Sequence, residues 1–228
     1  MPGIDSEKEL VAKHAAGLAR DGMIIGLGTG STAAFAIAEL GRRVRTGLRI
    51  TGVASSNASG KLAASVGIPV LPFDDLSRLD LTIDGADEID GDLNAVKGAG
   101  GALMREKIIA SASDVMVAIV DSSKVVPRIG KAKIPIEVLP FALAWAEKSA
   151  QSMGALVSHR ATPSGEMFRT DQNNFILDLV FERGYDSARL ASALDSIPGV
   201  LEHGLFLSEI DVLLIGTGEA VETRRRSK

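Results

Sequence analysis

The sequence predicts an α/β protein in which a mostly parallel sheet, covered by helices on both faces, carries a smaller inserted α+β unit. Short apolar runs alternate with helical patterns up to about residue 120, a different rhythm begins near residue 134, and an apolar run of the first kind returns at residues 210–218. Residues 1–130 and 205–228 are therefore expected to form one domain, and residues 131–204 a second domain inserted into it.

The first domain is expected to be Rossmann-like. Its strand-like runs are apolar without alternation, which is typical of parallel strands that are buried on both faces. Helical patterns of ten or so residues separate these runs. The predicted strands are residues 23–28, 48–55, 68–73, 79–84 and 115–120, and the predicted helices are residues 32–41, 57–67 and 102–112.

The inserted domain is expected to be ferredoxin-like. Its elements follow the order βαββαβ, which is the split unit of such domains. The expected strands are residues 134–139, 155–161, 173–182 and 200–206, and the expected helices are residues 141–154 and 186–199. The polar tail "TRRRSK", residues 223–228, is expected to lie in solvent.

Composition narrows the class of partner. The chain has 25 Lys and Arg residues and 29 Asp and Glu residues. The resulting formal charge of −4 argues against a nucleic-acid binder. The absence of Cys excludes disulfides and thiolate metal sites, and makes the cytoplasm the natural expectation. The apolar runs are too short to span a bilayer, so no membrane partner is expected either.

The segment "GLGTGST", residues 26–32, follows a strand and opens a helix. Glycines and the hydroxyls of Thr29, Ser31 and Thr32 at a helix N-terminus can cradle an anion such as a phosphate. The dinucleotide fingerprint would need glycine at Ser31, so a dinucleotide is not indicated. An ordinary strand-to-helix turn would use similar residues, and the local pattern leaves both interpretations open.

The segment "IDGADEID", residues 83–90, concentrates Asp84, Asp87, Glu88 and Asp90 at the end of a predicted buried strand. An EF-hand frame fails because its twelfth place would fall on Lys97. A solvated, capping loop is the simpler alternative. Its position favours a ligand site, since ligands of open α/β sheets bind beyond the carboxyl ends of the strands.

Two further segments carry cations towards the same edge of the sheet. "KGAGGALMREK" begins with Lys97, continues through a glycine-rich turn in which backbone can approach a ligand closely, and places Glu106 early in a helix. "DSSK" places Lys124 just after the strand at residues 115–120, where a phosphate could be held. Taken alone, Glu106 and Lys124 would each more often be a solvated surface group.

In this order and spacing, "GLGTGST", "DGADEI", "KGAGGALMREKI" and "DSSK" resemble the signature segments of the A-type ribose-5-phosphate isomerases, and the resemblance runs through nearly the whole chain. It implies reversible isomerisation of ribose 5-phosphate to ribulose 5-phosphate in the non-oxidative pentose phosphate pathway. It also implies that no metal or organic cofactor takes part, and that the enzyme is a homodimer or a dimer of dimers.

The resemblance also implies roles for individual residues. Glu106 matches the general base, and Lys97, Asp84 and Asp87 match the other catalytic residues. Ring opening is the expected task of Asp84 and hydroxyl binding that of Asp87, although the sequence leaves the two roles interchangeable. The matching substrate-binding residues are Lys8, Thr29, Gly30, Ser31, Thr32, Gly85, Ala86, Gly98, Ala99, Gly100 and Lys124.

The chain departs from the family pattern at Ala99, where glycine is frequent, and at Met104, where threonine often stands. Two other functions share parts of the pattern. A sugar-phosphate-sensing module would keep the phosphate loop but would need neither Glu106 nor Lys97. A related amino-sugar-phosphate deaminase would be expected to use a histidine near the acidic loop, which contains none.

Overall fold

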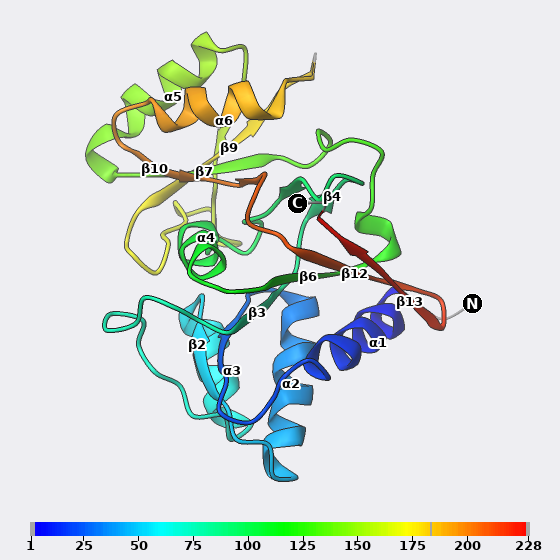
Figure 1. Ribbon diagram of the computed structural model, residues 1–228. Helices are drawn as coiled ribbons and strands as arrows, with labels where there is room; N and C mark the ends of the chain where they lie inside the picture. Colours follow the sequence, from blue (N-terminus) through cyan, green and yellow to red (C-terminus); the bar gives the residue numbers. More distant parts are fainter. Residues whose placement is uncertain (1–2, 183, 227–228) are drawn as a thin grey trace.

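The computed structural model describes residues 3–182 and 184–226 and is built on a six-stranded sheet (Figure 1). The strand order is β13-β12-β6-β3-β1-β2, and neighbouring strands are parallel except for β12 with β13. The expected mostly parallel sheet is thus confirmed. Its strands are β1 (Ile24–Leu27), β2 (Thr51–Ala54), β3 (Leu81–Asp84), β6 (Met116–Asp121), β12 (Val212–Thr217) and β13 (Ala220–Arg225).

Helices cover both faces of this sheet because its central strands are apolar on both sides. Along β6, Val117 and Ile119 pack in the cluster that includes α1, α2 and α3, whereas Ala118 and Val120 pack on the opposite face with Ala110 of α4. In Figure 1, α1 and α2 lie below the sheet and α4 lies above it. The helices are α1 (Ile4–Ala16), α2 (Ser31–Arg45), α3 (Asn57–Ser65) and α4 (Leu103–Ser111).

The second sheet has four antiparallel strands in the order β10-β7-β9-β8. Together with two helices it follows the βαββαβ order of the expected ferredoxin-like unit. The helices bury Ala146, Ala150, Leu190 and Leu194 against the sheet. The elements are β7 (Ile134–Val138), a short 3₁₀ turn η2 (Pro140–Ala142), α5 (Leu143–Ser152), β8 (Leu156–His159), β9 (Phe175–Val180), α6 (Ser187–Asp195) and β10 (Val200–His203).

The predicted strand at residues 200–206 is divided between two sheets. β10 ends at His203, and the chain then enters a three-stranded sheet of order β11-β5-β4. Gly204 stands at the division, where its N–H donates to Pro135 O at 2.8 Å. A Cβ at Gly204 would lie 2.3 Å from Lys97 O, so this crossing needs glycine. The small strands are β4 (Glu88–Ile89), β5 (Ala95–Val96) and β11 (Leu205–Phe206).

The strand expected at residues 68–73 is wrong. Val70 makes a single parallel bridge to Gly52, and the neighbouring Pro69 and Pro72 have no N–H with which to extend the ladder. The expectation that the tail lies free in solvent is also wrong for its first part. Thr223 belongs to β13 and pairs there with Leu214 of β12. The last two residues of the tail lie outside the described residues.

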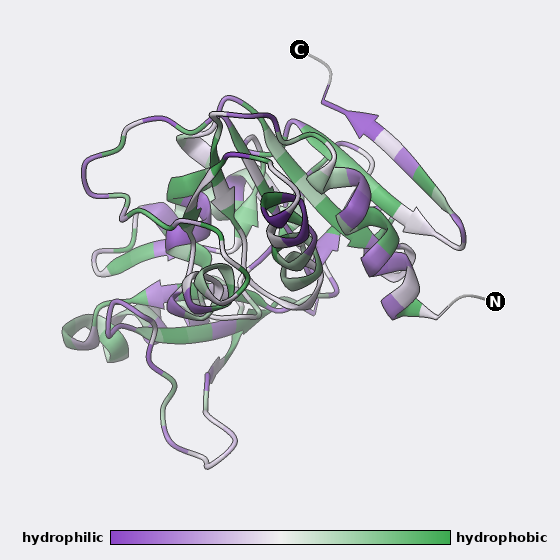
Figure 2. Ribbon diagram, turned by 90° about the horizontal axis from the view of Figure 1, so that it is seen from below, coloured by the Kyte–Doolittle hydropathy of each residue, from purple (hydrophilic) through white to green (hydrophobic). Residues whose placement is uncertain are grey.

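Hydropathy follows this architecture. Figure 2 colours the strands of the interior mostly green and much of β13, which closes the sheet at its edge, purple. Over the part of the chain that the structure describes, no helix combines the length and apolar character that crossing a bilayer requires.

Candidate active site

Three loops meet at the carboxyl edge of the large sheet, because β1, β3 and β6 are parallel neighbours. The loop after β1 leads into α2, the loop after β3 carries Asp84 to Asp87, and the 3₁₀ turn η1 (Ser122–Lys124) follows β6. They enclose a cavity of about 220 Å³. Its lining residues are Thr29, Gly30, Ser31, Thr32, Gly85, Ala86, Asp87, Lys97, Gly98, Ala99, Gly100, Glu106 and Lys124.

A buried lysine between two acids forms the floor of this cavity. Lys97 Nζ lies 2.9 Å from Asp84 Oδ2 and 3.2 Å from Glu106 Oε2, and it donates to Gly85 O at 2.5 Å. The three residues are each at most 3% exposed. Glu106 Oε2 has this ion-pair contact but no hydrogen-bond partner. This oxygen is therefore buried against the Lys97 ammonium, and no backbone N–H donates to it.

Burial decides the protonation behaviour of Glu106. Desolvation raises the pKa of its carboxyl to about 7, the Lys97 charge opposes this rise, and the Asp84 charge adds to it. Burial lowers the pKa of Lys97, but the charges of Asp84 and Glu106 outweigh burial and hold that pKa above its ordinary value. Glu106 is thus poised to exchange a proton near neutral pH while Lys97 stays charged.

The structure separates Asp84 and Asp87, which the sequence alone could not. Asp84 lies beneath the cavity, where Oδ1 accepts from the N–H groups of Thr29 (3.0 Å) and Gly85 (2.7 Å) and Oδ2 accepts from Lys97. Asp87 stands in the cavity wall, where its Oδ2 accepts from Ala99 N–H at 2.9 Å. Asp84 therefore orients Lys97, while Asp87 lines the cavity itself.

The other two acids of the cluster serve the fold. The carboxylate of Glu88 accepts from the backbone N–H groups of residues 130–132 at 3.0, 3.1 and 2.6 Å. Asp90 Oδ1 accepts from the N–H groups of Asp92 and Asn94, both at 3.0 Å. Both carboxylates are buried and bind backbone N–H groups, so neither is the solvated group of the simpler alternative. Of the four acids, Asp87 lines the cavity and Asp84 contacts Lys97.

The glycine-rich turn after Lys97 needs glycine for conformation and for space. Gly98 has φ +103°, and a Cβ there would lie 2.8 Å from both Leu103 Cβ and Pro135 Cγ. Arg160, from the end of β8, donates to Gly98 O at 2.6 Å and to Ala99 O at 3.1 Å. Arg160 was not predicted as part of the site, because it lies 62 positions from Gly98 and belongs to no local motif.

The loop before α2 has the features expected of an anion site. Gly30 is the N-cap with φ +105°, and the first turn of α2 has no acidic residue. Lys124 reaches the same cavity from η1. Sequence reasoning missed a hydroxyl cluster behind this loop, in which Thr29 Oγ1 contacts the side chains of Ser55 (2.8 Å) and Ser56 (2.9 Å).

Lys8 is the one predicted substrate-binding residue that does not line the cavity. Its Nζ lies 3.2 Å from the exposed carboxylate of Asp5 on the same helix. Its neighbour Glu7, however, accepts from the N–H of Ser122 in η1 at 3.0 Å. The start of α1 is thereby tied to the turn that carries Lys124.

A cluster outside the cavity has the composition of a metal site. Among the described residues, Asp195, Glu202 and His203 have ligand-type atoms within 4.8 Å of one another. The Lys107 ammonium lies inside this group, 2.6 Å from Glu202 Oε1 and 3.1 Å from His203 Nδ1. A bound cation would be repelled by that charge, so the group is an ion-paired cluster.

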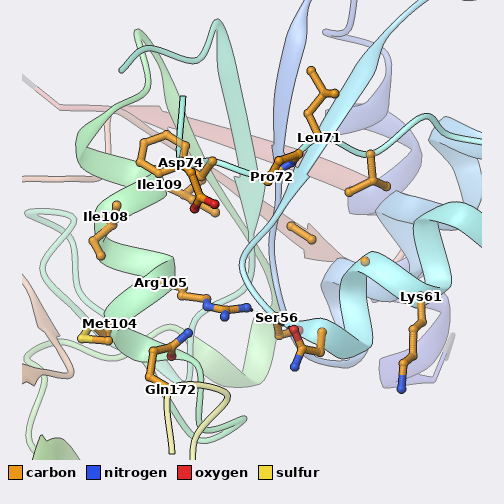
Figure 3. Close-up of a pocket in the computed structure, with 15 residues that line it drawn as sticks. Ser56, Lys61, Leu71, Pro72, Asp74, Met104, Arg105, Ile108, Ile109 and Gln172 are labelled. Carbon is orange, nitrogen blue, oxygen red and sulfur yellow. Dashed lines mark hydrogen bonds between the residues drawn. The ribbon is translucent and has the colours of Figure 1, made fainter. Parts of the chain in front are cut away.

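A larger cavity of about 690 Å³ lies on the other side of α4 (Figure 3). Its lining is mainly apolar, and Arg105 reaches across it towards Ser56. Arg105 is engaged by Asp171 at 3.6 Å and by Asn57 Oδ1 at 3.3 Å. Its described lining contains no buried pair of acid and lysine, whereas the smaller cavity is lined by the buried pair of Glu106 and Lys97.

The comparisons agree with this geometry. The family model of ribose 5-phosphate isomerase A (phosphoriboisomerase A) matches residues 51–220. The chain belongs to this family. A relative named ribose-5-phosphate isomerase A from Sphingopyxis alaskensis is 49% identical over 228 residues, which is all of both chains.

Solved structures of the family superpose closely on this one. The enzyme from Methanocaldococcus jannaschii has a TM-score of 0.93 at 37% identity, covering 98% of this chain and 100% of that one. A D-ribose-5-phosphate isomerase in complex with phospho-erythronic acid has a TM-score of 0.94 at 36% identity, covering 99% of this chain and 100% of that one. The resemblance found in the sequence is thus confirmed, and so is the fold it implied.

Proposed function

We propose that the protein is a ribose-5-phosphate isomerase, an aldose–ketose isomerase that interconverts D-ribose 5-phosphate and D-ribulose 5-phosphate through an enediolate, with Glu106 as the general base. One observation carries the proposal: Glu106 lies 3.2 Å from the Lys97 ammonium in a cavity that is also lined by the glycine- and hydroxyl-rich loop before α2. The family relative that was solved with phospho-erythronic acid, a phosphorylated sugar acid, supports the same class of ligand.

The chemistry requires one base and one stabilising cation. Glu106 removes the proton from C2 of the open-chain aldose and returns it to C1, while the hydroxyl proton of O2 passes to O1 and C2 becomes the carbonyl. Negative charge develops on oxygen between the two steps. Lys97, which is held charged by Asp84 and Glu106, stabilises this charge from a buried position.

Ring opening must precede isomerisation, because the cyclic sugar has no carbonyl. It moves the proton of the anomeric hydroxyl to the ring oxygen and breaks the bond between C1 and that oxygen. We assign this transfer to the hydrogen-bonded pair of Asp84 and Lys97, and hydroxyl binding to Asp87 in the cavity wall. Both assignments extend the roles that the sequence predicted.

The phosphate is assigned to the loop before α2 and to Lys124. The backbone of Gly30 to Thr32 and the helix dipole supply N–H groups and partial positive charge, and Lys124 adds a full charge. Gly85, Ala86, Gly98, Ala99 and Gly100 would contact the sugar through their backbone. Lys8 would join the phosphate only if its side chain turned away from Asp5.

Oligomerisation and domain organisation are further parts of this proposal. Residues 1–130 and 205–228 would act as the catalytic domain, with residues 131–204 as a ferredoxin-like domain at the contact between two copies of the chain. Exposed apolar side chains on that second unit support such a contact: Phe141 is 102% and Trp145 57% exposed. A cytoplasmic location is proposed because a doubly charged sugar phosphate does not cross bilayers unaided.

The test is conversion of ribose 5-phosphate to ribulose 5-phosphate by the purified chain in the presence of a chelator. Turnover that is equal with and without the chelator is expected, since the assigned chemistry uses only side chains. A chain that binds ribose 5-phosphate by calorimetry but turns none over would instead be a sugar-phosphate-binding module.

A further inference from the structure

A short segment that links the two sheets, residues 202–206, touches both elements that carry the reacting groups. We call it the crossover segment. It contains the end of β10 and all of β11, and it passes directly behind Lys97 and α4. None of its residues lines the cavity. Any effect it has on the reaction must therefore act through Lys97 or Glu106.

On one side the crossover segment holds the backbone and the side chain of Lys97. The Lys97 N–H donates to Gly204 O at 2.8 Å, and Leu205 pairs with Val96 in the small sheet. The ring of Phe206 is fully buried, with its centroid 5.3 Å from Lys97 Nζ. The lysine is thereby fixed from behind, while its ammonium faces the two acids.

On the other side the crossover segment holds α4 through Lys107, the neighbour of Glu106. Lys107 Nζ donates to Glu202 Oε1 at 2.6 Å and to His203 O at 2.8 Å. It also lies 5.0 Å from the centroid of the Phe206 ring, so the same ring contacts both ammonium groups. Lys107 is only 8% exposed, and a lysine buried to this extent persists only where it is well paired.

The state of His203 fits this arrangement. Its Nδ1 accepts from Leu205 N–H at 3.3 Å and lies 3.1 Å from Lys107 Nζ, which requires the nitrogen to carry no proton. Burial and then the Lys107 charge lower the pKa of His203, so the ring is neutral near pH 7. The crossover segment therefore offers hydrogen-bond acceptors to Lys107, and the neutral His203 ring does not repel the lysine charge.

We propose that Lys107 is a positioning residue, which locks the rotation and height of α4 on the crossover segment so that Glu106 stands within ion-pair distance of Lys97. The inference rests on the proposed role of Glu106 as base. Adjacent helical residues point about 100° apart, so fixing Lys107 also fixes the direction of Glu106. Because the crossover segment holds Lys97 as well, one rigid element sets the separation of base and cation.

The experiment compares Lys107→Met with Lys107→Arg and with the control Lys61→Met, which makes the same change at an exposed lysine of α3. Melting temperatures are measured first, and kinetics are run well below them. Lys107→Met is expected to lower kcat for ribose 5-phosphate about 10- to 100-fold, with KM changed less than about threefold. Lys107→Arg, which keeps charge and donors, should recover most of kcat.

A second readout separates positioning from mere stability. Glu106 faces Lys97 from the glycine-rich turn and Asp84 and Asp87 from the end of β3. If Glu106 moves away from Lys97, the acid limb of the kcat/KM profile shifts to higher pH, because less positive charge opposes protonation. A variant that is only less stable keeps the parent profile.

Parent values of kcat and of the acid limb in folded Lys107→Met would overturn the inference. If that variant does not fold, Lys107→Gln takes its place with the same two outcomes. Glu106→Gln is assayed in parallel. Full activity of Glu106→Gln would reject the proposed base itself, whereas its inactivity beside an unaffected Lys107→Met would reject the positioning role alone.

Discussion

Glu7 and Glu106 are both buried glutamates on helices, and each is followed by a lysine, yet their surroundings differ in one decisive respect. The carboxylate of Glu7 accepts from Gly218 N–H (2.8 Å), Ser122 N–H (3.0 Å) and Ser122 Oγ (2.8 Å). Glu106 Oε2 contacts the Lys97 ammonium at 3.2 Å and accepts from no backbone N–H. The hydrogen bonds from Gly218 and Ser122 lower the pKa of Glu7, whereas burial raises that of Glu106 to about 7.

The difference teaches how one fold uses the same side chain for two purposes. A carboxylate whose oxygens are filled by donors is stabilised in its charged form and joins segments of the chain. A carboxylate buried beside a single lysine, without backbone donors, is less stable as an anion and takes up protons readily. The under-satisfied glutamate is therefore the reactive one.

The largest effect is expected from Glu106→Gln, which removes the ionisable group and keeps its size. Because the amide cannot accept the C2 proton, kcat should fall by about 10³-fold, while KM for ribose 5-phosphate should stay within a few-fold. Steady-state kinetics measure both parameters. Turnover close to the parent value would remove Glu106 from the mechanism.

The next effect is the pH dependence of the parent enzyme. The pKa of Glu106 is raised to about 7, so the active base form is present above that pH and is lost below it. The value of kcat/KM should therefore fall about tenfold for each pH unit below 7. A profile that stays flat down to about pH 5 would contradict the raised pKa.

A smaller and more selective effect is expected from Lys124→Ala. Loss of one charge from the phosphate end should raise KM for ribose 5-phosphate about tenfold, with little change in kcat, because Lys124 takes no part in the contacts of Lys97 with Asp84 and Glu106. D-Ribose, which has no phosphate, is the control substrate. Equal losses of kcat/KM for both sugars would show that Lys124 does not hold the phosphate.

The smallest effects concern stability, and the two glutamates should give opposite signs. Glu7→Gln can keep an acceptor for only one of the two segments that Glu7 joins, so it should cost about 1–3 kcal/mol at neutral pH. Since the pKa of Glu7 is lowered, its contribution is present above its ordinary value of 4.5 and is lost as pH falls through the folded-state value. Urea unfolding should show the difference from the parent shrinking in acid.

The contribution of Glu106 to folding stability depends on pH in the opposite direction. Its raised pKa gives a contribution that is present below 4.5 and is lost as pH rises through about 7. At pH 8 the Glu106→Gln chain should therefore melt no lower than the parent. This is expected where a charged active-site group lowers the stability of the folded protein. Equal decreases in melting temperature for Glu7→Gln and Glu106→Gln would erase the distinction between the two sites.

Most of the fold and of the site could be predicted because both follow local rules. Buried parallel strands have uninterrupted apolar runs, and loops at their carboxyl ends share an edge, so Thr29, Asp87 and Lys124 could be expected together. The strand expected at residues 68–73 failed because its prolines cannot donate, and residues 200–206 divided at Gly204 because of a contact with Lys97.

The alternation of elements by itself determined the layered sheet and the βαββαβ order of the second unit, and the four signature segments pointed through their family resemblance to the candidate acids and cations. Only the tertiary structure decided which of four clustered acids reach the cavity, and that Glu106 lacks the donors that Glu7 has. Those donors lie 115 and 211 positions from Glu7, and Arg160 lies far from the turn it holds. Satisfaction of a buried polar group depends on such distant partners, so no local pattern can specify it.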